Sequence, residues 1–402
     1  MKTSERLVIV GGSLAGLRAC VAARRQGFDG KITLIGAEAH PPYDRPPLSK
    51  AFLGSDDEAL PPWLPEAAML EDQYSVELRF GEPATRLDLA AQTVQTSRES
   101  VPYDALLIAT GATARTLPGT EGIDGVHTLR TLEDAQHVRA ALDAGARTVI
   151  IGAGFIGAEI ASAARKRGLD VTILEAQSTP LVRAVGAVAG EALAALHRRN
   201  GSDLRCGVVV EEVTGSSTVS AVLLSDGTEI PADLVIVGIG AFPATGWLND
   251  SGLVLENGVV CDAMLSAAPN VWAAGDVARW MSPDFGTLLR LEHWTNASEQ
   301  AAHAVRNILD PAAATAYSHI PYFWSDWYGS RIQFSGVPWG EPQIVSGAWD
   351  APAFAALYRD GNRVVGALTL NRRADIMKYR ALIARSASWD EALQLAELRN
   401  AA

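Results

Sequence analysis

The stretch Thr148-Val-Ile-Ile-Gly-Ala-Gly-Phe-Ile-Gly157 decides the fold, because an apolar run leads directly into the pattern Gly-x-Gly-x-x-Gly. In this pattern the first glycine allows a tight turn, the second lets a pyrophosphate approach the backbone, and the third lets helix and strand pack closely. A helix near Ala158 to Arg167 and a second aliphatic strand from Val171 to Leu174 are expected to follow. The stretch therefore predicts the start of a dinucleotide-binding unit on a parallel sheet.

An acidic residue at the end of the second strand refines the choice of dinucleotide. Glu175 lies 18 residues after Gly157, where a carboxylate can accept hydrogen bonds from an adenosine ribose. Its charge would repel the 2′-phosphate that distinguishes NADP from NAD. An ordinary glycine-rich turn is the alternative for the motif alone, but the strand, turn, helix and acidic residue occur in the required order. The sequence therefore predicts NADH in preference to NADPH.

The same unit occurs a second time, at the start of the chain. The run from Arg6 to Val10 leads into Gly11-Gly-Ser-Leu-Ala-Gly16, and a helix near Leu17 to Gln26 and a strand from Lys31 to Ile35 are expected to follow. Two such units in one chain suggest two dinucleotides used together, typically a tightly bound FAD and a diffusing nicotinamide.

This first unit departs from the pattern at one position. Ser13 stands where the middle glycine is expected. A side chain at this position makes close approach of a phosphate to the turn less certain. Glu38 follows the second strand and is the carboxylate expected to hold a ribose, because Ala37 beside it cannot do so.

Composition excludes several classes of protein. The 402 residues include 46 acidic and 34 basic side chains, and a net charge of −12 has the wrong sign for a protein that coats nucleic acid. The three cysteines, at positions 20, 206 and 261, form no Cys-x-x-Cys pair and no cluster with histidine, so neither a metal site nor a disulfide framework is expected. No apolar stretch reaches the roughly 18 residues that a membrane helix needs. We expect a protein of the cytoplasm that binds no membrane.

The residue pattern of the sequence changes from about Ile320 onward. Alternating, aromatic-rich segments at 322–328, 331–335 and 363–370 predict antiparallel strands, closed by a helix near Asp390 to Arg399. Earlier in the chain, acidic residues at 56–58 and nearby prolines predict a surface loop. The predicted fold class is α/β, with two Rossmann-like dinucleotide-binding domains and an α+β domain at the C-terminus.

Six stretches carry a resemblance to a known family: Tyr43-Asp-Arg-Pro-Pro-Leu-Ser-Lys50, Ala109-Thr-Gly111, Leu129-Arg-Thr-Leu-Glu-Asp134, Val149-Ile-Ile-Gly-Ala-Gly-Phe-Ile-Gly-Ala-Glu159, Ala274-Gly-Asp276 and Tyr322-Phe-Trp-Ser-Asp326. Their order along nearly the whole chain resembles that of the two-dinucleotide-binding, glutathione-reductase-like flavoproteins, and among them the ferredoxin reductases of oxygenase and cytochrome P450 systems. The resemblance implies an FAD domain in two segments, 1–111 and 246–319, an NAD domain at 112–245 and an interface domain at 320–402.

The resemblance also implies the residues of both sites. Those expected to bind FAD are Gly11, Gly12, Ser13, Leu14, Ala15, Gly16, Glu38, Arg45, Lys50, Ala84, Ala109, Thr110, Gly111, Arg130, Asp276, Trp294 and Trp324. Those expected to bind NAD are Gly152, Gly154, Phe155, Ile156, Gly157, Glu159, Glu175, Arg183, Gly238, Ile239 and Gly240. Asp276 matches a carboxylate that holds the ribityl chain, with a helix N-cap as its alternative role. Trp294 and Trp324 match residues beside the isoalloxazine ring, with ordinary core packing as the alternative.

Lys50 and Glu159 are the expected catalytic residues, because they match an ion pair that resembling enzymes keep near flavin N5. There the positive charge could stabilise a developing anion, and the carboxylate could orient the lysine and the nicotinamide. Related disulfide reductases and peroxidases carry redox cysteines beside the flavin, but the segment Tyr43 to Lys50 contains none. Cys20 falls within the first predicted helix, where a buried structural thiol is expected. Electrons are expected to leave the flavin without a thiol intermediate.

The resemblance implies an NADH-dependent ferredoxin reductase, because a flavin accepts a hydride and can release electrons singly to an iron–sulfur protein. Such a partner is generally acidic, so a basic patch is expected to steer it, and the candidate cations are Arg290, Arg331, Arg372, Arg373, Lys378 and Arg380. A solvated charged face is the alternative for these cations. Two other functions stay open: a similar flavoprotein that reduces rubredoxin or another acceptor, and a redox-switched binding protein resembling apoptosis-inducing factor.

Overall fold

The structure is a computed structural model that describes residues 5–55 and 60–401. The surface loop predicted at residues 56–58 lies outside these ranges. The chain divides into two compact units, each made of three segments. Unit 1 comprises Met1–Asp44, Pro62–Thr113 and Phe242–His319, and unit 2 comprises Arg45–Pro61, Ala114–Ala241 and Ile320–Ala402. The division into three domains at residues 111, 245 and 319 stays a prediction.

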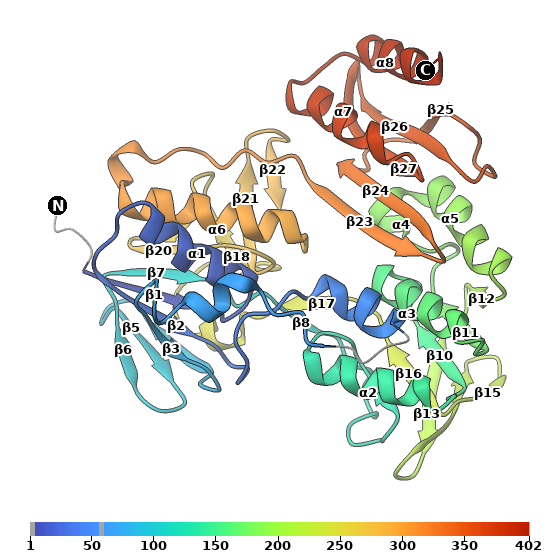
Figure 1. The fold of residues 1–402 in the computed structure, drawn as a ribbon, viewed down its shortest axis with the longest axis horizontal. Coiled ribbons are helices and arrows are strands. Elements are labelled where there is room, and N and C mark those ends of the chain that lie inside the picture. The colour runs from blue at the N-terminus through green and yellow to red at the C-terminus, as the bar shows by residue number, and fades with distance from the viewer. Residues whose placement is uncertain (1–4, 56–59, 402) are drawn as a thin grey trace. The chain divides into compact units, whose positions relative to one another are not determined.

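Unit 1 is built on a six-stranded sheet in the order β19-β20-β7-β1-β2-β3. Its central strand, β1 (Arg6–Val10), pairs in parallel with β2 (Lys31–Ile35) on one side and β7 (Ala105–Ile108) on the other. Helices α1 (Leu14–Arg25) and α6 (Trp294–Leu309) lie side by side against this sheet (Figure 1). The strands β1, β2 and β7 are aliphatic and almost wholly buried, as expected when helices cover a parallel sheet.

The remaining elements of unit 1 complete the sheet and add two small sheets, β4-β5-β6 and β18-β21-β22. Their bounds are β3 Val76–Arg79, β4 Ala84–Asp88, β5 Thr93–Thr96, β6 Ser100–Pro102, β18 Val259–Cys261, β19 Ser266–Ala268, β20 Val271–Ala273, β21 Ala278–Ser282 and β22 Thr287–Leu289. The strands β8 (Ala112–Ala114) and β17 (Ala241–Pro243) contain the unit boundaries.

Helix α1 begins earlier than the sequence predicts. The expected start was near Leu17, but the helix starts at Leu14 with Ser13 as its N-cap, three residues after β1 ends. The turn between β1 and α1 therefore consists of Gly11, Gly12 and Ser13 alone. The free N–H groups of the first helical turn face the carboxyl end of β1.

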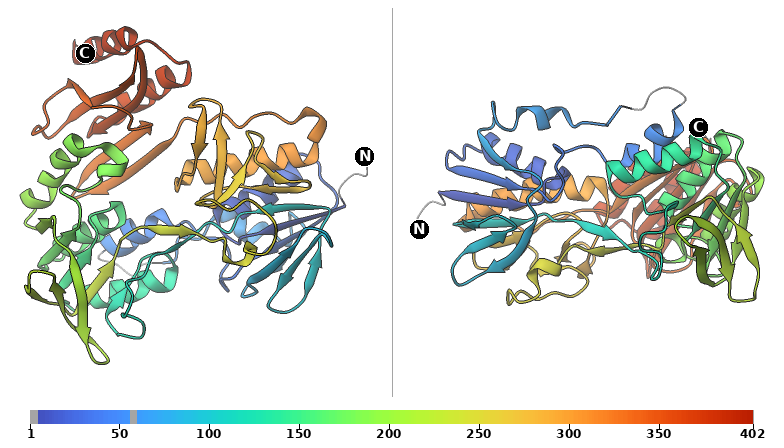
Figure 2. Two further views of the ribbon diagram at one scale, coloured as in Figure 1. Left: turned by 180° about the vertical axis from the view of Figure 1, so that it is seen from behind. Right: turned by 90° about the horizontal axis from the view of Figure 1, so that it is seen from below.

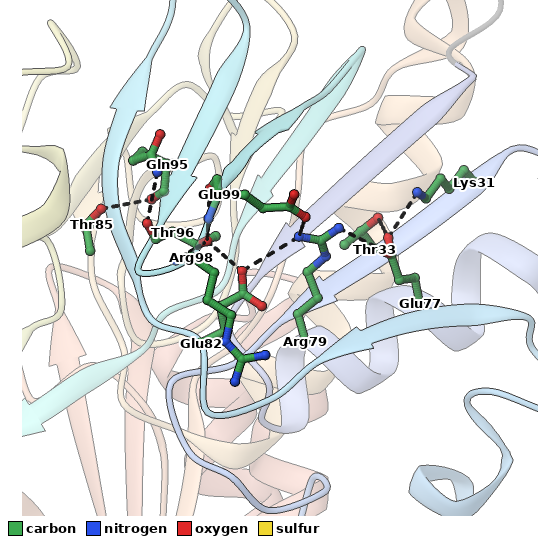
Figure 3. Close-up of polar contacts among 10 residues, drawn as sticks. All are labelled: Lys31, Thr33, Glu77, Arg79, Glu82, Thr85, Gln95, Thr96, Arg98 and Glu99. Atoms are coloured by element: carbon green, nitrogen blue, oxygen red, sulfur yellow. Dashed lines mark hydrogen bonds and ion pairs between the residues drawn. The ribbon is translucent and has the colours of Figure 1, made fainter.

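An ion-pair cluster joins the end of β3 to the hairpin of β4 and β5 (Figure 3). The guanidinium of Arg79 pairs with Glu77 at 3.0 Å, with Glu82 at 3.7 Å and, at closer range, with Glu99. Thr96 donates its hydroxyl to Glu82, which is buried. These contacts hold the start of β4, where Ala84 lies, beside the carboxyl edge of the main sheet.

Unit 2 has a second parallel sheet, in the order β12-β11-β10-β16-β9. As in unit 1, the strand that precedes the glycine pattern is central: β10 (Thr148–Ile151) pairs with β11 (Val171–Glu175) and β16 (Leu234–Val237). Helix α3 (Phe155–Lys166) follows β10. The other elements of this part are η1 Leu48–Phe52, β9 Val126–His127, α2 Leu132–Asp143, α4 Val182–Val185, α5 Ala187–Arg199, β12 Asp203–Cys206, β13 Val210–Gly215, β14 Val219–Leu224 and β15 Glu229–Pro231.

The C-terminal part of unit 2 is an antiparallel sheet in the order β23-β24-β27-β26-β25, with two helices packed against it (Figure 2). The bounds are β23 Tyr322–Trp327, β24 Ser330–Gly336, β25 Gln343–Ser346, β26 Phe354–Asp360, β27 Arg363–Leu370, α7 Arg373–Ala384 and α8 Trp389–Ala401. The predicted α/β fold class, with an α+β region at the C-terminus, is confirmed. Within residues 5–55 and 60–401, no helix is long and apolar enough to cross a membrane.

Candidate dinucleotide and electron-transfer site

The loop after β1 has the backbone geometry of a phosphate loop. Gly11 has a φ of 130°, and a Cβ atom there would lie 2.1 Å from the carbonyl oxygen of Ala109, so only glycine fits. The loop ends at the N-terminus of the 12-residue helix α1, whose first N–H groups and dipole favour an anion. This part of unit 1 fits a dinucleotide pyrophosphate.

The predicted ribose ligand of unit 1 lies in a defined environment. Glu38 follows β2, and its carboxylate accepts a hydrogen bond of 2.5 Å from the hydroxyl of Tyr43. The carbonyl oxygen of Glu38 accepts the N–H of Gly81, beyond the end of β3. Because a carboxylate offers about four lone-pair sites, Glu38 retains acceptor capacity for ribose hydroxyls.

Two predicted FAD segments of unit 1 meet at the carboxyl edge of the sheet. Ala109 to Gly111 follow β7, Asp276 follows β20, and these two strands are parallel neighbours. No helix begins at Asp276, since β21 starts at Ala278, so the N-cap alternative is wrong. Beside this edge the buried amide of Gln300 uses its oxygen to accept the N–H of Gly275, while its Nε2 has no partner among the described residues. A buried polar atom left over at this edge is consistent with a bound polar ligand.

Trp294 is the first residue of α6 and is half-buried. Its indole nitrogen donates to the carboxylate of Asp44 at 2.7 Å. The hydrogen bond fixes the plane of the ring, which a purely packed aromatic residue would not need.

The other predicted FAD residues belong to unit 2, except Ala84 on β4 of unit 1. Arg45 and Arg130 come together, because a guanidinium nitrogen of Arg45 donates to the carbonyl oxygen of Arg130 at 2.5 Å. Trp324 lies on β23, and the guanidinium of Arg331 is 5.6 Å from the centroid of its ring.

The second phosphate loop, between β10 and α3, repeats the geometry of the first. Gly152 has a φ of 99°, and a Cβ atom there would lie 2.4 Å from the carbonyl oxygen of Gly238. At Gly154, the N-cap of α3, a Cβ atom would meet nothing closer than 3.7 Å. The fold itself therefore tolerates a side chain at this position. The same reasoning explains why Ser13 is compatible with the corresponding N-cap of α1.

Glu175 lies against this second loop. One carboxylate oxygen accepts the N–H of Ala153 at 2.9 Å, and the other accepts the N–H of Gln177 at 2.8 Å. Both contacts orient the carboxylate, and each oxygen keeps a second lone pair for a ribose hydroxyl. The other predicted NAD residues surround the loop less closely: Ile156 is exposed at its rim, Gly238 to Gly240 follow β16, and Arg183 is exposed on the short helix α4.

The predicted catalytic pair is present in unit 2. The ammonium of Lys50 lies 2.8 Å from Oε1 and 2.9 Å from Oε2 of Glu159, so it spans both carboxylate oxygens. Glu159 lies on α3 and is 4% exposed, and Lys50 lies on η1. A charge so deeply buried requires compensation by a partner and by hydrogen bonds.

Two serines that sequence reasoning did not select supply that compensation. The hydroxyl of Ser49 donates to Oε2 of Glu159 and the hydroxyl of Ser325 donates to Oε1. The only signal in the sequence was that Ser325 is a small polar residue on a strand face otherwise formed by Phe323 and Trp327. A pocket of about 450 Å³ reaches this pair and is lined by Ser49, Lys50, Gly54, Glu159, Ser162, Ala163, Arg165, Lys166, Asn200, Asp326, Tyr328 and Gly329.

The candidate docking cations do not form one free basic patch. Arg331 pairs with Asp326 at 2.7 Å, Arg372 pairs with Asp375 at 2.6 Å, and Arg380 donates to the carbonyl oxygen of Ile320. Arg290 belongs to unit 1 and pairs with Glu292. Of the six cations, only Arg373 and Lys378 on α7 are exposed without an ion pair to any described residue.

The thiols are unsuited to redox chemistry. Burial raises the pKa of Cys20 to about 12, and burial together with Asp262 raises the pKa of Cys261 to about 12. The pKa of Cys206 is also raised, chiefly by burial. All three cysteines are free. Because the thiolate is the reactive form, a raised pKa makes each thiol a poorer nucleophile at neutral pH.

Comparison with known proteins agrees with this geometry. The model of the pyridine nucleotide-disulphide oxidoreductase family matches residues 5–301, and a model of the reductase C-terminal domain matches residues 322–400. Rhodocoxin reductase of Rhodococcus erythropolis is 37% identical over 387 residues, which cover 94% of this chain and 89% of that protein.

Two further relatives resemble the chain over most of its length. The ferredoxin–NAD(+) reductase component of the biphenyl dioxygenase system of Paraburkholderia xenovorans is 38% identical, over 85% of this chain and 83% of that protein. The crystal structure of the covalent putidaredoxin reductase–putidaredoxin complex superposes with a TM-score of 0.89 at 32% identity and covers 99% of each chain. The chain is therefore an oxidoreductase of the pyridine nucleotide-disulphide oxidoreductase family and belongs, within that family, to the ferredoxin–NAD(+) reductases.

Proposed function

We propose that this protein binds FAD along the first phosphate loop and NADH along the second, and passes electrons from NADH singly to a 2Fe-2S ferredoxin that serves a P450 or Rieske-type oxygenase. The observation that carries this proposal is the presence of two dinucleotide loops in a chain whose three free cysteines all have raised pKa values. A family member without a redox thiol is best suited to an acceptor that takes electrons directly from a flavin.

Each cofactor has its own binding residues in this proposal. The loop Gly11 to Gly16 and the N-terminus of α1 hold the FAD pyrophosphate, and Glu38 holds its ribose. Gly152 to Gly157 and the N-terminus of α3 hold the pyrophosphate of NADH. Glu175 accepts the hydroxyls of the NADH ribose and excludes a 2′-phosphate, since its two contacts with backbone N–H groups keep the carboxylate facing the loop.

The catalytic residues act through charge and position. Bound FAD supplies the chemistry, which is acceptance of a hydride from NADH and release of electrons one at a time. In the proposed site, the positive charge of Lys50 lies close to where negative charge develops during hydride transfer. There it stabilises this negative charge more than water would. Glu159 keeps the ammonium of Lys50 in one position, because the ammonium spans both of its oxygens.

The proposed partner surface centres on helix α7. Arg373 and Lys378 are exposed on α7 and are the two cations best able to meet an acidic ferredoxin, while the ion-paired Arg290, Arg331 and Arg372 and the hydrogen-bonded Arg380 would contribute less. The free, unclustered cysteines are compatible with a reducing compartment, so we propose the cytoplasm.

Steady-state assays with a panel of acceptors test this function. The purified holoprotein would be supplied with NADH and, in separate reactions, with a 2Fe-2S ferredoxin, a rubredoxin, a quinone or oxygen. We expect ferredoxin to be reduced at least about tenfold faster than any other acceptor. Faster reduction of rubredoxin or quinone would show that the acceptor is not a ferredoxin. Slow turnover with every acceptor, together with NADH-dependent dimerisation, would favour a redox-switched binding protein.

A further inference from the structure

Every polar group around the Glu159 carboxylate is a hydrogen-bond donor. Lys50 spans both oxygens, Ser49 donates to one of them and Ser325 to the other. Both serines are buried, at 6% and 0% exposure. Together these contacts fix both the position and the plane of the carboxylate.

The direction of one of these hydrogen bonds is set by a second residue. The indole nitrogen of Trp327 lies 2.8 Å from the hydroxyl oxygen of Ser325. Since an indole N–H can only donate, Ser325 must accept at this contact. The single hydrogen of its hydroxyl group then has Glu159 as its remaining partner. Trp327 therefore fixes the direction in which the buried Ser325 hydroxyl donates, which is toward Oε1 of Glu159.

The same strand face holds the helix that carries Glu159. Phe323, Ser325 and Trp327 alternate along β23 and share one face. Opposite them, α3 presents Phe155, whose ring lies 4.7 Å from that of Phe323 and 6.3 Å from that of Trp327. One turn further along α3, Glu159 meets Ser325. The contact continues where the hydroxyl of Ser162 accepts the N–H of Tyr328 at 2.8 Å.

We propose that Ser325 and Trp327 are positioning residues that hold the Glu159 carboxylate turned toward Lys50. Without them the carboxylate can rotate, because the terminal torsion of a glutamate side chain is broad. Trp327 acts indirectly, by fixing the direction of the Ser325 hydroxyl. The inference deepens the proposed function and rests on it, because it assigns a role to residues that surround the proposed catalytic pair.

The other charged side chains near Lys50 and Glu159 have partners of their own. Arg165, Lys166 and Asp326 line the same pocket as Lys50 and Glu159. Arg165 pairs with Asp170, Lys166 donates to the carbonyl oxygen of Gly54, and Asp326 pairs with Arg331. Within the described residues, Lys50 is the one cation in an ion pair with Glu159.

The direct test is infrared spectroscopy of the FAD-loaded protein labelled with carbon-13 glutamate, with Glu159→Gln as the subtraction reference. In Ser325→Ala and Trp327→Phe, the antisymmetric stretching band of the Glu159 carboxylate is expected to shift and broaden, because the carboxylate loses a fixed hydrogen-bond donor and can adopt several orientations. Ser325→Thr, which keeps the hydroxyl, is expected to restore the wild-type spectrum.

Two control variants separate this role from packing. Ser335→Ala removes an equally buried hydroxyl that donates to the carbonyl oxygen of Pro321. Trp280→Phe removes a buried indole N–H that has no partner among the described residues. Neither is expected to change the Glu159 signal. Identical Glu159 carboxylate bands in wild type, Ser325→Ala and Trp327→Phe would overturn the inference.

A kinetic measurement on the same proteins distinguishes this inference from the proposed function. The rate of flavin reduction by NADH in Ser325→Ala and Trp327→Phe should fall toward that of Glu159→Gln, while Ser335→Ala and Trp280→Phe should keep the wild-type rate. If Glu159→Gln reduces its flavin as fast as wild type, the catalytic role of Glu159 fails. The infrared result would still decide whether Ser325 and Trp327 hold the orientation of its carboxylate.

Discussion

Phe155, directly after the N-cap of α3, packs against Phe323 of strand β23 with the ring centroids 4.7 Å apart and the planes tilted by 58°. The C-terminal sheet thus supports the loop that is proposed to bind NADH. Its inner strand face contacts α3 through an aromatic pair, a buried hydroxyl and a backbone hydrogen bond. The C-terminal part of the chain is therefore expected to influence NADH binding as well as partner docking.

Replacing Phe323 with alanine should weaken nucleotide binding. An aromatic pair contributes about 0.5–1.5 kcal/mol beyond its buried area, so we expect the dissociation constant of NAD+ to rise about two- to tenfold. Isothermal titration calorimetry measures this directly. Trp349→Ala, which removes ring packing against Phe354 in the same sheet, is the control and should leave NAD+ affinity unchanged. Equal affinities in Phe323→Ala and wild type would show that the aromatic pair does not support the loop.

Replacing Glu175 with glutamine should relax the choice between NADH and NADPH. The variant loses the charge that repels a 2′-phosphate, while its amide oxygen can still accept the N–H of Ala153. We expect the ratio of kcat/KM for NADH over NADPH to fall by at least about tenfold. Glu191→Gln, at an exposed pair with Arg198 on α5, removes the same charge and should leave the ratio unchanged. An unaltered ratio in Glu175→Gln would argue against Glu175 as the ribose ligand.

Removing Lys50 should destabilise the protein. Lys50→Met leaves the charge of Glu159 buried with only the two serine donors, and breaking a buried pair typically costs about 3–5 kcal/mol. Lys50 keeps some exposure, so we expect about 2–4 kcal/mol in calorimetric unfolding of the holoprotein.

A double-mutant cycle gives the sharper result for this pair. The double variant Lys50→Met/Glu159→Gln should be more stable than the sum of the two single effects predicts, since it leaves no uncompensated charge. The exposed Lys378→Met serves as control. Additive effects would mean that the two side chains do not interact in solution.

At acid pH, the thermal stability of the protein should depend on whether Glu77 is charged. Burial would raise its pKa, but hydrogen bonds from Thr33, Arg79 and Lys31 outweigh burial and lower the pKa to about 2 (Figure 3). A pKa below the ordinary value of 4.5 means that this contribution is complete above about pH 4.5 and is lost as the pH falls toward 2. Between about pH 5 and pH 3, wild type should lose more thermal stability than Glu77→Gln. Glu397→Gln, exposed on α8, should behave as wild type, and parallel losses in all three proteins would contradict the account.

Thiol reagents should leave electron transfer intact. Cys20 and Cys261 are buried with pKa values raised to about 12, so in the native state only Cys206, which is half-buried, should react within minutes. After modification, NADH-dependent ferredoxin reduction should stay within about twofold of the untreated rate. A loss of activity that parallels modification of a single cysteine would indicate a thiol step.

The sequence was sufficient to predict the elements that depend on local pattern. The strands at Arg6–Val10, Lys31–Ile35 and Thr148–Ile151 have the predicted bounds, because continuous aliphatic runs that end in glycine identify buried parallel strands. The pairing of Lys50 with Glu159 was predicted through a family resemblance. Ser49 and Ser325 were not, because their role comes from a contact between segments more than 100 residues apart along the chain. A serine in a strand carries no local signal of such a contact.

The most direct test of the central claim is anaerobic rapid mixing. The holoprotein would be reduced with one equivalent of NADH and mixed with excess oxidised 2Fe-2S ferredoxin, while flavin and cluster absorbance are followed separately. We predict that two ferredoxins are reduced per NADH, with cluster bleaching in step with flavin reoxidation. A flavin that is reduced by NADH but stays reduced in the presence of ferredoxin would contradict the account.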